Sequence, residues 1–355
     1  MTTAAADSDP RRAPEPPPAP AATGVGSLPG DDMAESIRMV MGELGEPPGV
    51  PFLPELPQRG VGADMIGRGA ALLVDLYAEV QPSGWRIVDR PGRDHGRARS
   101  HLSADLDLLE EYTQGYVGPL KIQVAGPWTM AAAVELPHGD KMLADTGAVR
   151  DVAASLAEGL RLHAQDLRKR VPGAQLVIQL DEPSLPGVLK GSVRTASGFG
   201  ALRAVEENVV RDLLRSVIDG VKAGGPADSA IPVIVHCCAP DVPFGTLHRA
   251  GAAGISFDMS LLSGRHDEAL GELIEAGVLL LAGVVPSTEP ATPGPAVSEL
   301  RDRVLRLRRL GFSWPQVAEA VIVTPSCGLS GASPGWARRA LRLCRDTARA
   351  LEEVD

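Results

Sequence analysis

The stretch AQLVIQLDEP at residues 174–183 decides the fold. Its interior is a nearly continuous run of Leu, Val and Ile, which is typical of a strand buried on both faces of a parallel sheet. Most of the similar runs along the chain also end in Gly, Pro, Ser or an acid, as strands do where a loop begins. There are seven of them, at residues 23–29, 50–57, 120–127, 231–238, 253–260, 277–286 and 320–328.

Long helical patterns separate these runs. Segment 31–44 begins with two acids and spaces its apolar residues so that they share one helical face. Only the interval after 231–238 is short, with room for two or three turns. The other helical patterns cover 62–80, 103–116, 148–170, 201–223, 265–277, 297–311 and 333–354.

Eight strands that alternate with about eight helices predict an α/β fold, a (β/α)8 TIM barrel. We expect residues 1–22, which are rich in Ala and Pro, to form a disordered tail, and residues 23–355 to form one barrel domain. Segment 84–96 could add a hairpin. The alternative is a doubly wound open sheet, but GVGSLPG at 24–30 lacks the G-x-G-x-x-G loop that such a sheet would use for phosphate.

Composition excludes several classes of protein. The chain has 35 Lys and Arg against 45 Asp and Glu, which gives a net charge of −10, and only 3% aromatic residues. An acidic surface with few aromatic rings argues against nucleic-acid binding. No apolar stretch approaches the roughly 20 residues of a membrane helix. The four cysteines are too few for a disulfide scaffold and no secretory signal precedes them, so we expect a cytoplasmic protein with reduced thiols.

Reactive side chains gather where the predicted strands end, which is where barrel enzymes place their active sites. His236 and Cys238 are two residues apart on one strand, so both side chains point to the same side. Cys327 follows the last strand and Asp258 ends the sixth. Nitrogen and sulfur ligands favour Zn²⁺, and we predict a zinc site made by His236, Cys238, Cys327 and Asp258. The alternative is that the cysteines are ordinary core residues.

Candidates for substrate binding lie at the same edge. Asp181 and Glu182 end a strand whose interior is apolar, and alternation sends at most one of them straight into the barrel mouth. Ser27 follows Gly26 in a turn that could present backbone N–H groups to a carboxylate. Trp128 could stack on a flat ligand, and Glu55 could touch substrate. Helix capping, tight turns and packing are the competing roles.

These residues carry a family resemblance. The motifs GVGSLPG, AGPWTM, LDEPSLPG, VHCC, SFD and VTPSCGLSG resemble the catalytic C-terminal domain of cobalamin-independent methionine synthase, over about residues 23–350. That domain belongs to a barrel superfamily that includes uroporphyrinogen decarboxylase. The resemblance implies a zinc-dependent enzyme that transfers a methyl group to the thiol of homocysteine and forms methionine.

Site roles implied by the resemblance fall on particular positions. His236, Cys238 and Cys327 would hold the zinc, with Asp258 where the family has a glutamate ligand. Asp181 would bind the homocysteine amino group and Ser27 its carboxylate. The family's E-R-x-D stretch has no match here, so Glu55 is a stand-in by position only.

The methyl donor is the least determined part of this prediction. Family enzymes have a second barrel that helps to bind polyglutamyl methyltetrahydrofolate, and the sequence predicts only one barrel. The donor would be methyltetrahydrofolate or a methylated corrinoid protein. Because the chain is acidic overall, we expect little gain from a longer glutamate tail. The alternatives are an enzyme of the uroporphyrinogen decarboxylase type and a non-catalytic zinc-binding barrel.

Overall fold

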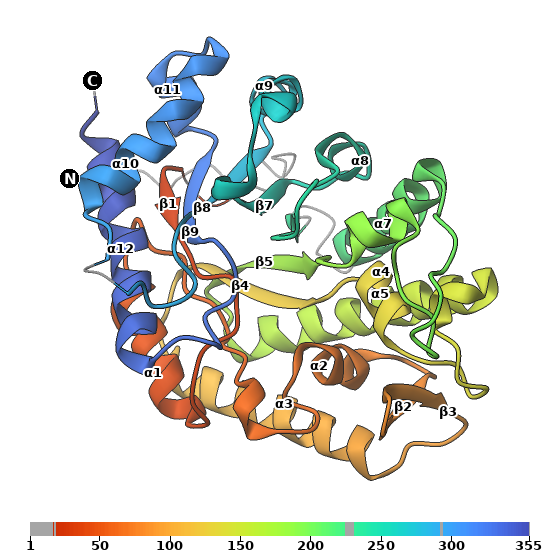
Figure 1. Cartoon of the computed structure of the whole chain (residues 1–355). Coiled ribbons are helices and arrows are strands. Elements are labelled where there is room, and N and C mark those ends of the chain that lie inside the picture. Colours follow the sequence, from red (N-terminus) through yellow and green to blue (C-terminus); the bar gives the residue numbers. More distant parts are fainter. Residues whose placement is uncertain (1–16, 18, 224–230, 292–293, 355) are drawn as a thin grey trace.

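A curled parallel sheet with helices on its outer side forms the core of the computed structural model (Figure 1). The structure describes residues 17, 19–223, 231–291 and 294–354. Most of the predicted tail therefore lies outside the described residues. The tail boundary at residue 22 is nevertheless wrong, because the first strand occupies Ala21–Ala22 and both side chains are buried.

The sheet has seven strands, and every neighbouring pair is parallel. In spatial order the strands are β1 (Ala21–Ala22), β9 (Val321–Pro325), β8 (Leu279–Val285), β7 (Gly254–Asp258), β6 (Val233–His236), β5 (Ala174–Asp181) and β4 (Gly118–Ala125). These strands correspond to seven of the eight predicted runs. The parallel α/β class is confirmed.

The eighth predicted run, 50–57, lies between the two edges of this sheet without forming a regular strand. Its neighbourhood makes isolated parallel bridges, Ala22 to Gly49 and Ser27 to Glu55 on one side and Phe52 to Lys121 on the other. The sequence VPFLPELP explains the sparse pairing, because its three prolines have no backbone N–H to donate. We call this segment the seam (residues 49–55).

Helices cover the outer face of the sheet as predicted. They are α1 (Met33–Leu44), α2 (Met65–Leu72), α3 (Arg93–Tyr112), α4 (Pro127–Ala133), α5 (Thr146–Arg170), α6 (Leu185–Lys190), α7 (Glu207–Ala223), α8 (Phe244–Arg249), α9 (Asp267–Glu275), α10 (Val297–Leu305), α11 (Trp314–Ala318) and α12 (Pro334–Glu352). The interval after β6 is short, and it contains only the six-residue helix α8, as predicted. Within the described ranges, no helix is both long and apolar enough to cross a membrane.

Sequence reasoning misplaced the segment between α2 and β4. The helix expected at 62–80 ends at Leu72, and an antiparallel hairpin follows, made of β2 (Tyr77–Gln81) and β3 (Gly84–Val88). Gly84 supplies the positive φ of the hairpin turn, +128°. The hairpin thus lies earlier than expected. Helix α3 begins at Arg93 rather than at 103, because its first turns are mostly polar and the buried His95 and Ala98 do not make a recognisable apolar pattern.

Inward-facing residues of the sheet form a small apolar cluster of their own. It contains Ala21, Val50, Val177, Ile234, Leu279, Leu281 and Ile322, one or two from each contributing segment. Side chains two residues further along a strand point to the same side. The residues that follow Val177 and Ile234 by steps of two, including Asp181 and His236, therefore lie inside the curl at its carboxyl end.

Candidate functional site

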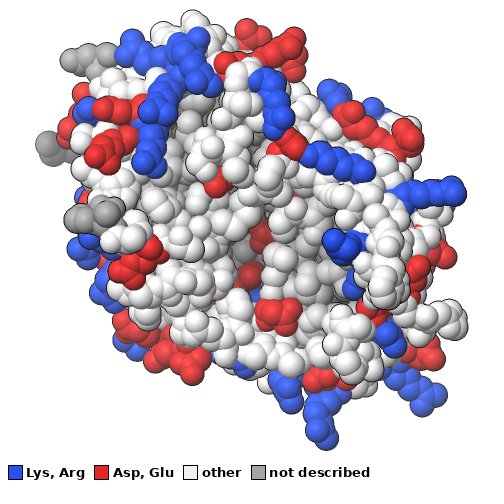
Figure 2. All heavy atoms as spheres, in the orientation of Figure 1, with Lys and Arg blue, Asp and Glu red and all other residues white. Residues whose placement is uncertain are grey.

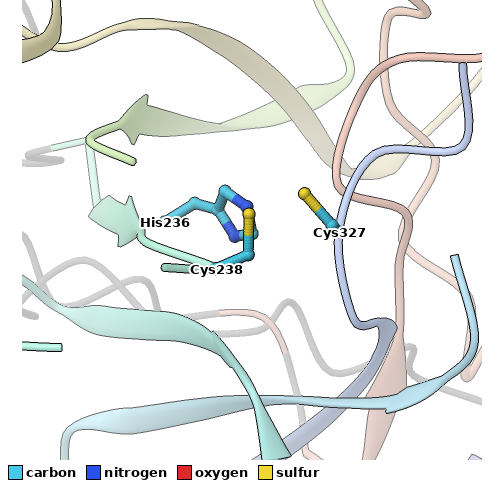
Figure 3. A group of neighbouring side chains, drawn as sticks. All are labelled: His236, Cys238 and Cys327. Carbon is cyan, nitrogen blue, oxygen red and sulfur yellow. The ribbon is translucent and has the colours of Figure 1, made fainter. Parts of the chain in front are cut away.

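Two strands and a loop bring nitrogen and sulfur together at the carboxyl end of the sheet. His236 ends β6, Cys238 follows it by two residues, and Cys327 reaches towards them from the loop after β9 (Figure 3). Their three donor atoms lie within 4.8 Å of one another. We call these three residues the metal group.

The metal group fits a zinc ion in donor type and in spacing. Tetrahedral zinc with Zn–S bonds of about 2.3 Å holds its sulfur ligands about 3.8 Å apart. A small contraction of the observed group would therefore place three donors at three corners. Three protein donors with one open position are usual for a catalytic zinc site.

A hydroxyl on the neighbouring strand orients the imidazole. Ser256 Oγ lies 2.8 Å from His236 Nδ1, and both residues are buried. This contact leaves Nε2 as the nitrogen that is free to bind a metal. Hydrogen bonds to the second nitrogen fix the orientation of most metal-bound histidines. Sequence reasoning missed Ser256, although its position two residues before the end of β7 was a usable signal.

Replacing Ser256 by alanine should weaken zinc binding by about 10- to 100-fold, the usual cost of losing such a supporting hydrogen bond. Competition with a chelator measures the zinc affinity. Ser260, which lies outside the strand, provides a matched serine-to-alanine control. An unchanged affinity in Ser256→Ala would show that the hydroxyl does not orient the ring.

A hydrogen bond joins the two sulfurs of the metal group. This bond from Cys238 lowers the pKa of Cys327, and His236 beside it acts in the same direction. The same contact raises the pKa of Cys238 above its ordinary value, together with burial. The arrangement thus favours the thiolate of Cys327, which is the form that binds metals.

Asp181 lies inside the curl beside the metal group. It is the last residue of β5, and only 6% of its surface is exposed. Gln179 Nε2 donates to its Oδ1 at 2.7 Å. Burial raises the pKa of Asp181, while the charges of His236 and Lys121 and the Gln179 hydrogen bond oppose that rise.

Glu55 is a second buried acid at the same end, carried by the seam. Gln123 Nε2 donates to it at 3.2 Å, and Arg68 Nε lies 3.6 Å from its Oε1. Burial raises the pKa of Glu55 to about 7, with the charge of Arg68 opposing the rise and the charge of Asp181 adding to it. The two carboxylates therefore repel each other, and a cation near both would relieve that repulsion.

Ser27 packs against the loop that carries Cys327. Its carbonyl accepts from Leu329 N at 2.8 Å. A Cβ added to Gly328 would lie 2.1 Å from Ser27 Oγ, so a larger residue at position 328 would displace the Ser27 hydroxyl. The structure therefore brings Ser27, Glu55 and Asp181 to the same end of the sheet as the metal group.

Polar side chains inside the curl hold this end together. Lys121 Nζ and Gln179 Nε2 both donate to the Val25 carbonyl at 2.9 Å, and Gln123 Nε2 donates to the Leu53 carbonyl at 2.8 Å. Sequence reasoning missed these residues. The signal was a polar residue at every second, inward position of otherwise apolar strands, as in LKIQVA and LVIQLD.

Glu182 faces the other way and does not bind substrate in this arrangement. It is fully buried and accepts hydrogen bonds from Trp128 N at 2.9 Å, from Thr129 N at 2.7 Å and from Thr129 Oγ1 at 2.8 Å. Glu182 therefore anchors the start of α4 to the end of β5. The prediction that it touches substrate is not supported.

Trp128 is likewise a packing residue in this structure. Its ring is 1% exposed and belongs to the main hydrophobic core. The indole N–H donates to the Val210 carbonyl at 3.2 Å, so the ring is tied to α7. The expected role as a platform for a flat ligand is therefore not supported either.

Replacing Glu182 by alanine should lower the free energy of unfolding by about 3 kcal/mol, because hydrogen bonds to buried charged groups contribute about 1.5–3 kcal/mol and the donors would be left unpaired. Denaturant titration measures this change. Zinc content per folded chain should stay unchanged, since Glu182 points away from the metal group. Loss of zinc with normal stability would place Glu182 in the site instead.

Asp258 stands outside the metal group. Its Oδ1 accepts from Ser260 N at 2.8 Å and caps the short turn Met259–Leu261. The structure thus does not bring the predicted fourth ligand to the other three. Of the remaining cysteines, Cys237 and Cys344 are both buried, and Cys344 lies within α12.

Sulfur and nitrogen donors at the carboxyl edge of a curled parallel sheet define the class of this protein. It is an α/β enzyme of the barrel kind, whose reactive groups lie where the strands end. Residues 19–350 match the family described as the cobalamin-independent synthase catalytic domain, and the chain belongs to that family. The resemblance drawn from the motifs, and the type of enzyme it implied, are confirmed.

A solved methionine synthase structure agrees with the fold. The chain is similar to a B12-independent methionine synthase from Shewanella sp. W3-18-1 in complex with selenomethionine, with a TM-score of 0.59 and 14% identity over 94% of this chain and 98% of that one. A GH5_18 protein from Streptomyces cattleya gives a TM-score of 0.44 with 16% identity, over 95% and 82% of the two chains. A search of curated protein sequences finds no match.

Proposed function

We propose that this chain is a zinc-dependent methyltransferase that methylates the thiol of homocysteine and forms methionine. The observation that carries the proposal is the metal group, His236, Cys238 and Cys327, at the carboxyl end of the sheet. Membership in the cobalamin-independent synthase family supports the reaction type. The donor is 5-methyltetrahydrofolate or a related methyl carrier.

The reaction requires a thiolate from a substrate thiol whose ordinary pKa is about 8.5. Zinc, when bound, ionises a coordinated thiol and keeps it nucleophilic. His236, Cys238 and Cys327 would supply three of its ligands, and the open position would take the substrate sulfur. Asp258, which caps a turn in this structure, remains a candidate for that position before substrate binds.

Substrate recognition would fall to the buried acids and to the Ser27 turn. Asp181, together with Glu55, would accept the homocysteine ammonium group, since both are buried acids at the same end of the sheet as the metal group and repel each other. Ser27 would contact the carboxylate. Holding the amino-acid end at a fixed place lets the sulfur meet the methyl group in line.

We also propose that the seam serves as the second strand of an eight-stranded barrel. Its bridges to β1 and to β4 support this assignment. Backbone hydrogen bonds from Leu53 N to the Lys121 carbonyl and from Glu55 N to the Gly26 carbonyl support it too, and Gln123 Nε2 adds a side-chain bond to the Leu53 carbonyl. The seam then contributes Glu55 at the same level at which the other strands present their functional residues.

The test combines zinc analysis of the purified protein with an assay of methionine formation from homocysteine. Methyltetrahydrofolate and a methylated corrinoid are supplied in parallel, because the family alone does not decide the donor. About one zinc per chain and methionine with one donor is the expected result. A protein that holds zinc but forms no methionine with either donor would contradict the proposal.

A further inference from the structure

A row of buried charges leads from Glu55 towards the surface. It consists of two arginines and two acids that alternate, in the order Arg59, Asp105, Arg68 and Glu55. Arg59 belongs to the short turn Pro57–Arg59, which follows the seam. Arg68 lies on α2 and Asp105 on α3. We call these four residues the charge row. The side chain of Arg59 is 13% exposed, and the other three are at most 4% exposed.

Asp105 binds both arginines of the charge row. Arg59 Nη1 and Nη2 donate to its two oxygens at 2.7 Å each, which is the paired geometry that guanidinium groups favour. Arg68 Nη1 donates to Asp105 Oδ2 at 2.5 Å. Arg68 Nε, by contrast, lies 3.6 Å from Glu55 Oε1, which is too far for a hydrogen bond. Arg68 is therefore held by Asp105 and acts on Glu55 only through its charge.

One oxygen of Glu55 has no partner. Gln123 Nε2 and Arg68 Nε both approach Oε1. Among the described residues, no donor lies within hydrogen-bond distance of Oε2. Asp181 is similar, because Gln179 donates to its Oδ1 and, in the part of the chain that the structure describes, nothing donates to its Oδ2. Each of these two buried carboxylates thus keeps an acceptor for a cationic donor.

The arrangement of the charge row directs an acid, and not an arginine, towards the site. Its two guanidinium groups and two carboxylates sum to zero charge. Asp105 makes the short contacts with both cations, and because attraction falls with distance, Glu55 is the less neutralised of the two acids. Figure 2 shows acidic side chains inside the hollow at the middle of the molecule and most lysines and arginines around its edge.

The other titratable groups around the row are two histidines, Lys121 and Asp181. Burial and the charges of the arginines lower the pKa of His101 on α3 and of His163 on α5, the latter to about 4. Both imidazoles are therefore neutral at and above neutral pH. Lys121 lowers and Asp181 raises the pKa of Glu55, and burial lowers the pKa of Lys121 itself to about 8. Because these groups stay in place in the variants below, differences between the variants report on the charge row.

We propose that Arg68 and Asp105 are positioning residues for the binding of an amino acid. Asp105 holds Arg68 near enough for its charge to favour the Glu55 carboxylate and too far away to occupy the free oxygen, which stays open for the ammonium group of the substrate. This assignment rests on the proposed function. Arg59 contributes by its paired contact with Asp105, which fastens the end of the seam, and with it Glu55, to α3.

Binding of an amino acid tests the charge row without requiring turnover. Calorimetry on the purified full chain measures the affinity for L-methionine, the product of the proposed reaction, and for its desamino analogue, which lacks only the amino group. The ratio of the two dissociation constants reports recognition of the ammonium group. A general loss of structure would weaken both ligands and leave this ratio unchanged.

Arg68→Gln should make the preference for methionine depend on pH. Arg68 opposes the rise that burial causes in the pKa of Glu55, and loss of such a neighbouring charge shifts a pKa by about one pH unit or more. Glu55 is then protonated at neutral pH and ionised only in alkaline buffer. The preference should fall by about tenfold at neutral pH and return in alkaline buffer, whereas Arg68→Lys, which keeps the charge, should retain it.

Asp105→Asn should have a different signature. Arg68, once released, can pair with the free oxygen of Glu55, so the preference for methionine should fall by about tenfold at both pH values. Arg86→Gln is the matched control, because it removes a guanidinium from another buried acid, Glu135, beside the hairpin of β2 and β3. It should cost stability and leave the preference unchanged.

Two results would overturn the proposal. One is an equal preference in wild type and Arg68→Gln at neutral pH, or no preference for methionine in wild type. The other is a loss in Arg68→Gln that alkaline buffer does not restore, because Arg68 would then only support the fold.

The same data separate this proposal from the proposed function. If no donor yields methionine while Arg68→Gln changes the preference as expected, the methyltransferase function fails and the charge row stands as part of an amino-acid site. If methionine forms but the preference is the same in wild type and Arg68→Gln, the function stands and the inference from the charge row fails.

Discussion

Cys327→Ser should purify with less than about a tenth of the zinc of the wild-type protein, and its rate of methionine formation should fall more than 100-fold. Supporting residues of zinc sites already cost 10- to 100-fold when they are lost, and a ligand itself should cost more. Cys327 is the only member of the metal group that comes from the far side of the sheet. Without it, two donors from one strand end would remain.

Controls make this result specific. Cys238→Ser should behave in the same way, whereas Cys344→Ala should keep its zinc, because Cys344 is buried within α12. Zinc is measured by atomic emission after dialysis, and folding by circular dichroism. Full zinc retention in Cys327→Ser would show that the three residues are not a metal site.

Asp181→Asn should lower kcat/KM for homocysteine by about thirtyfold or more while zinc stays bound. The substitution keeps the size of the side chain and removes its charge, and loss of one partner from a buried ion pair costs about 2 kcal/mol or more, where 1.4 kcal/mol is tenfold. The remaining hydrogen bond from Gln179 can be kept by the amide oxygen. Kinetics with homocysteine as the varied substrate measure the effect.

The neighbouring acid provides the control for this experiment. Glu182→Gln makes the same chemical change one residue further on, where the side chain faces α4 instead of the site. It should cost stability but leave the KM for homocysteine of the folded protein nearly unchanged. An unaltered kcat/KM in Asp181→Asn would show that the ammonium is held elsewhere.

Strand periodicity explains which parts of the site were predictable. Because side chains alternate along a strand, His236 and Cys238 had to share a side, and only one of Asp181 and Glu182 could face inward. The sequence could not tell which acid that was. The decision depends on α4, whose N-terminal amide groups bind Glu182, and α4 itself has too few residues for a helical pattern to be recognised.

Other differences between the predicted and the observed structure also have local causes. The prolines of VPFLPELP interrupt the ladder of a segment that still lies at a strand position. The run of apolar residues therefore predicted a more regular strand than its backbone hydrogen bonds form. Asp258 was predicted as a ligand from its place at a strand end. Its carboxylate instead accepts a hydrogen bond from a backbone N–H of the next turn. Aspartate side chains often bind nearby backbone groups in this way.

The seam also divides the site into two parts that differ in how firmly backbone hydrogen bonds hold them. The metal donors stand on or beside β6 and β9, which are held by continuous ladders. Glu55 and Ser27 belong to segments that form only isolated bridges, supported by backbone hydrogen bonds such as Glu55 N to the Gly26 carbonyl and by side-chain donors from β4 and β5. Local opening costs least where backbone hydrogen bonds are few. We therefore expect the end of the site at Glu55 and Ser27 to open locally more readily than the metal group, so that in the proposed enzyme an amino acid could enter and leave without release of the ion.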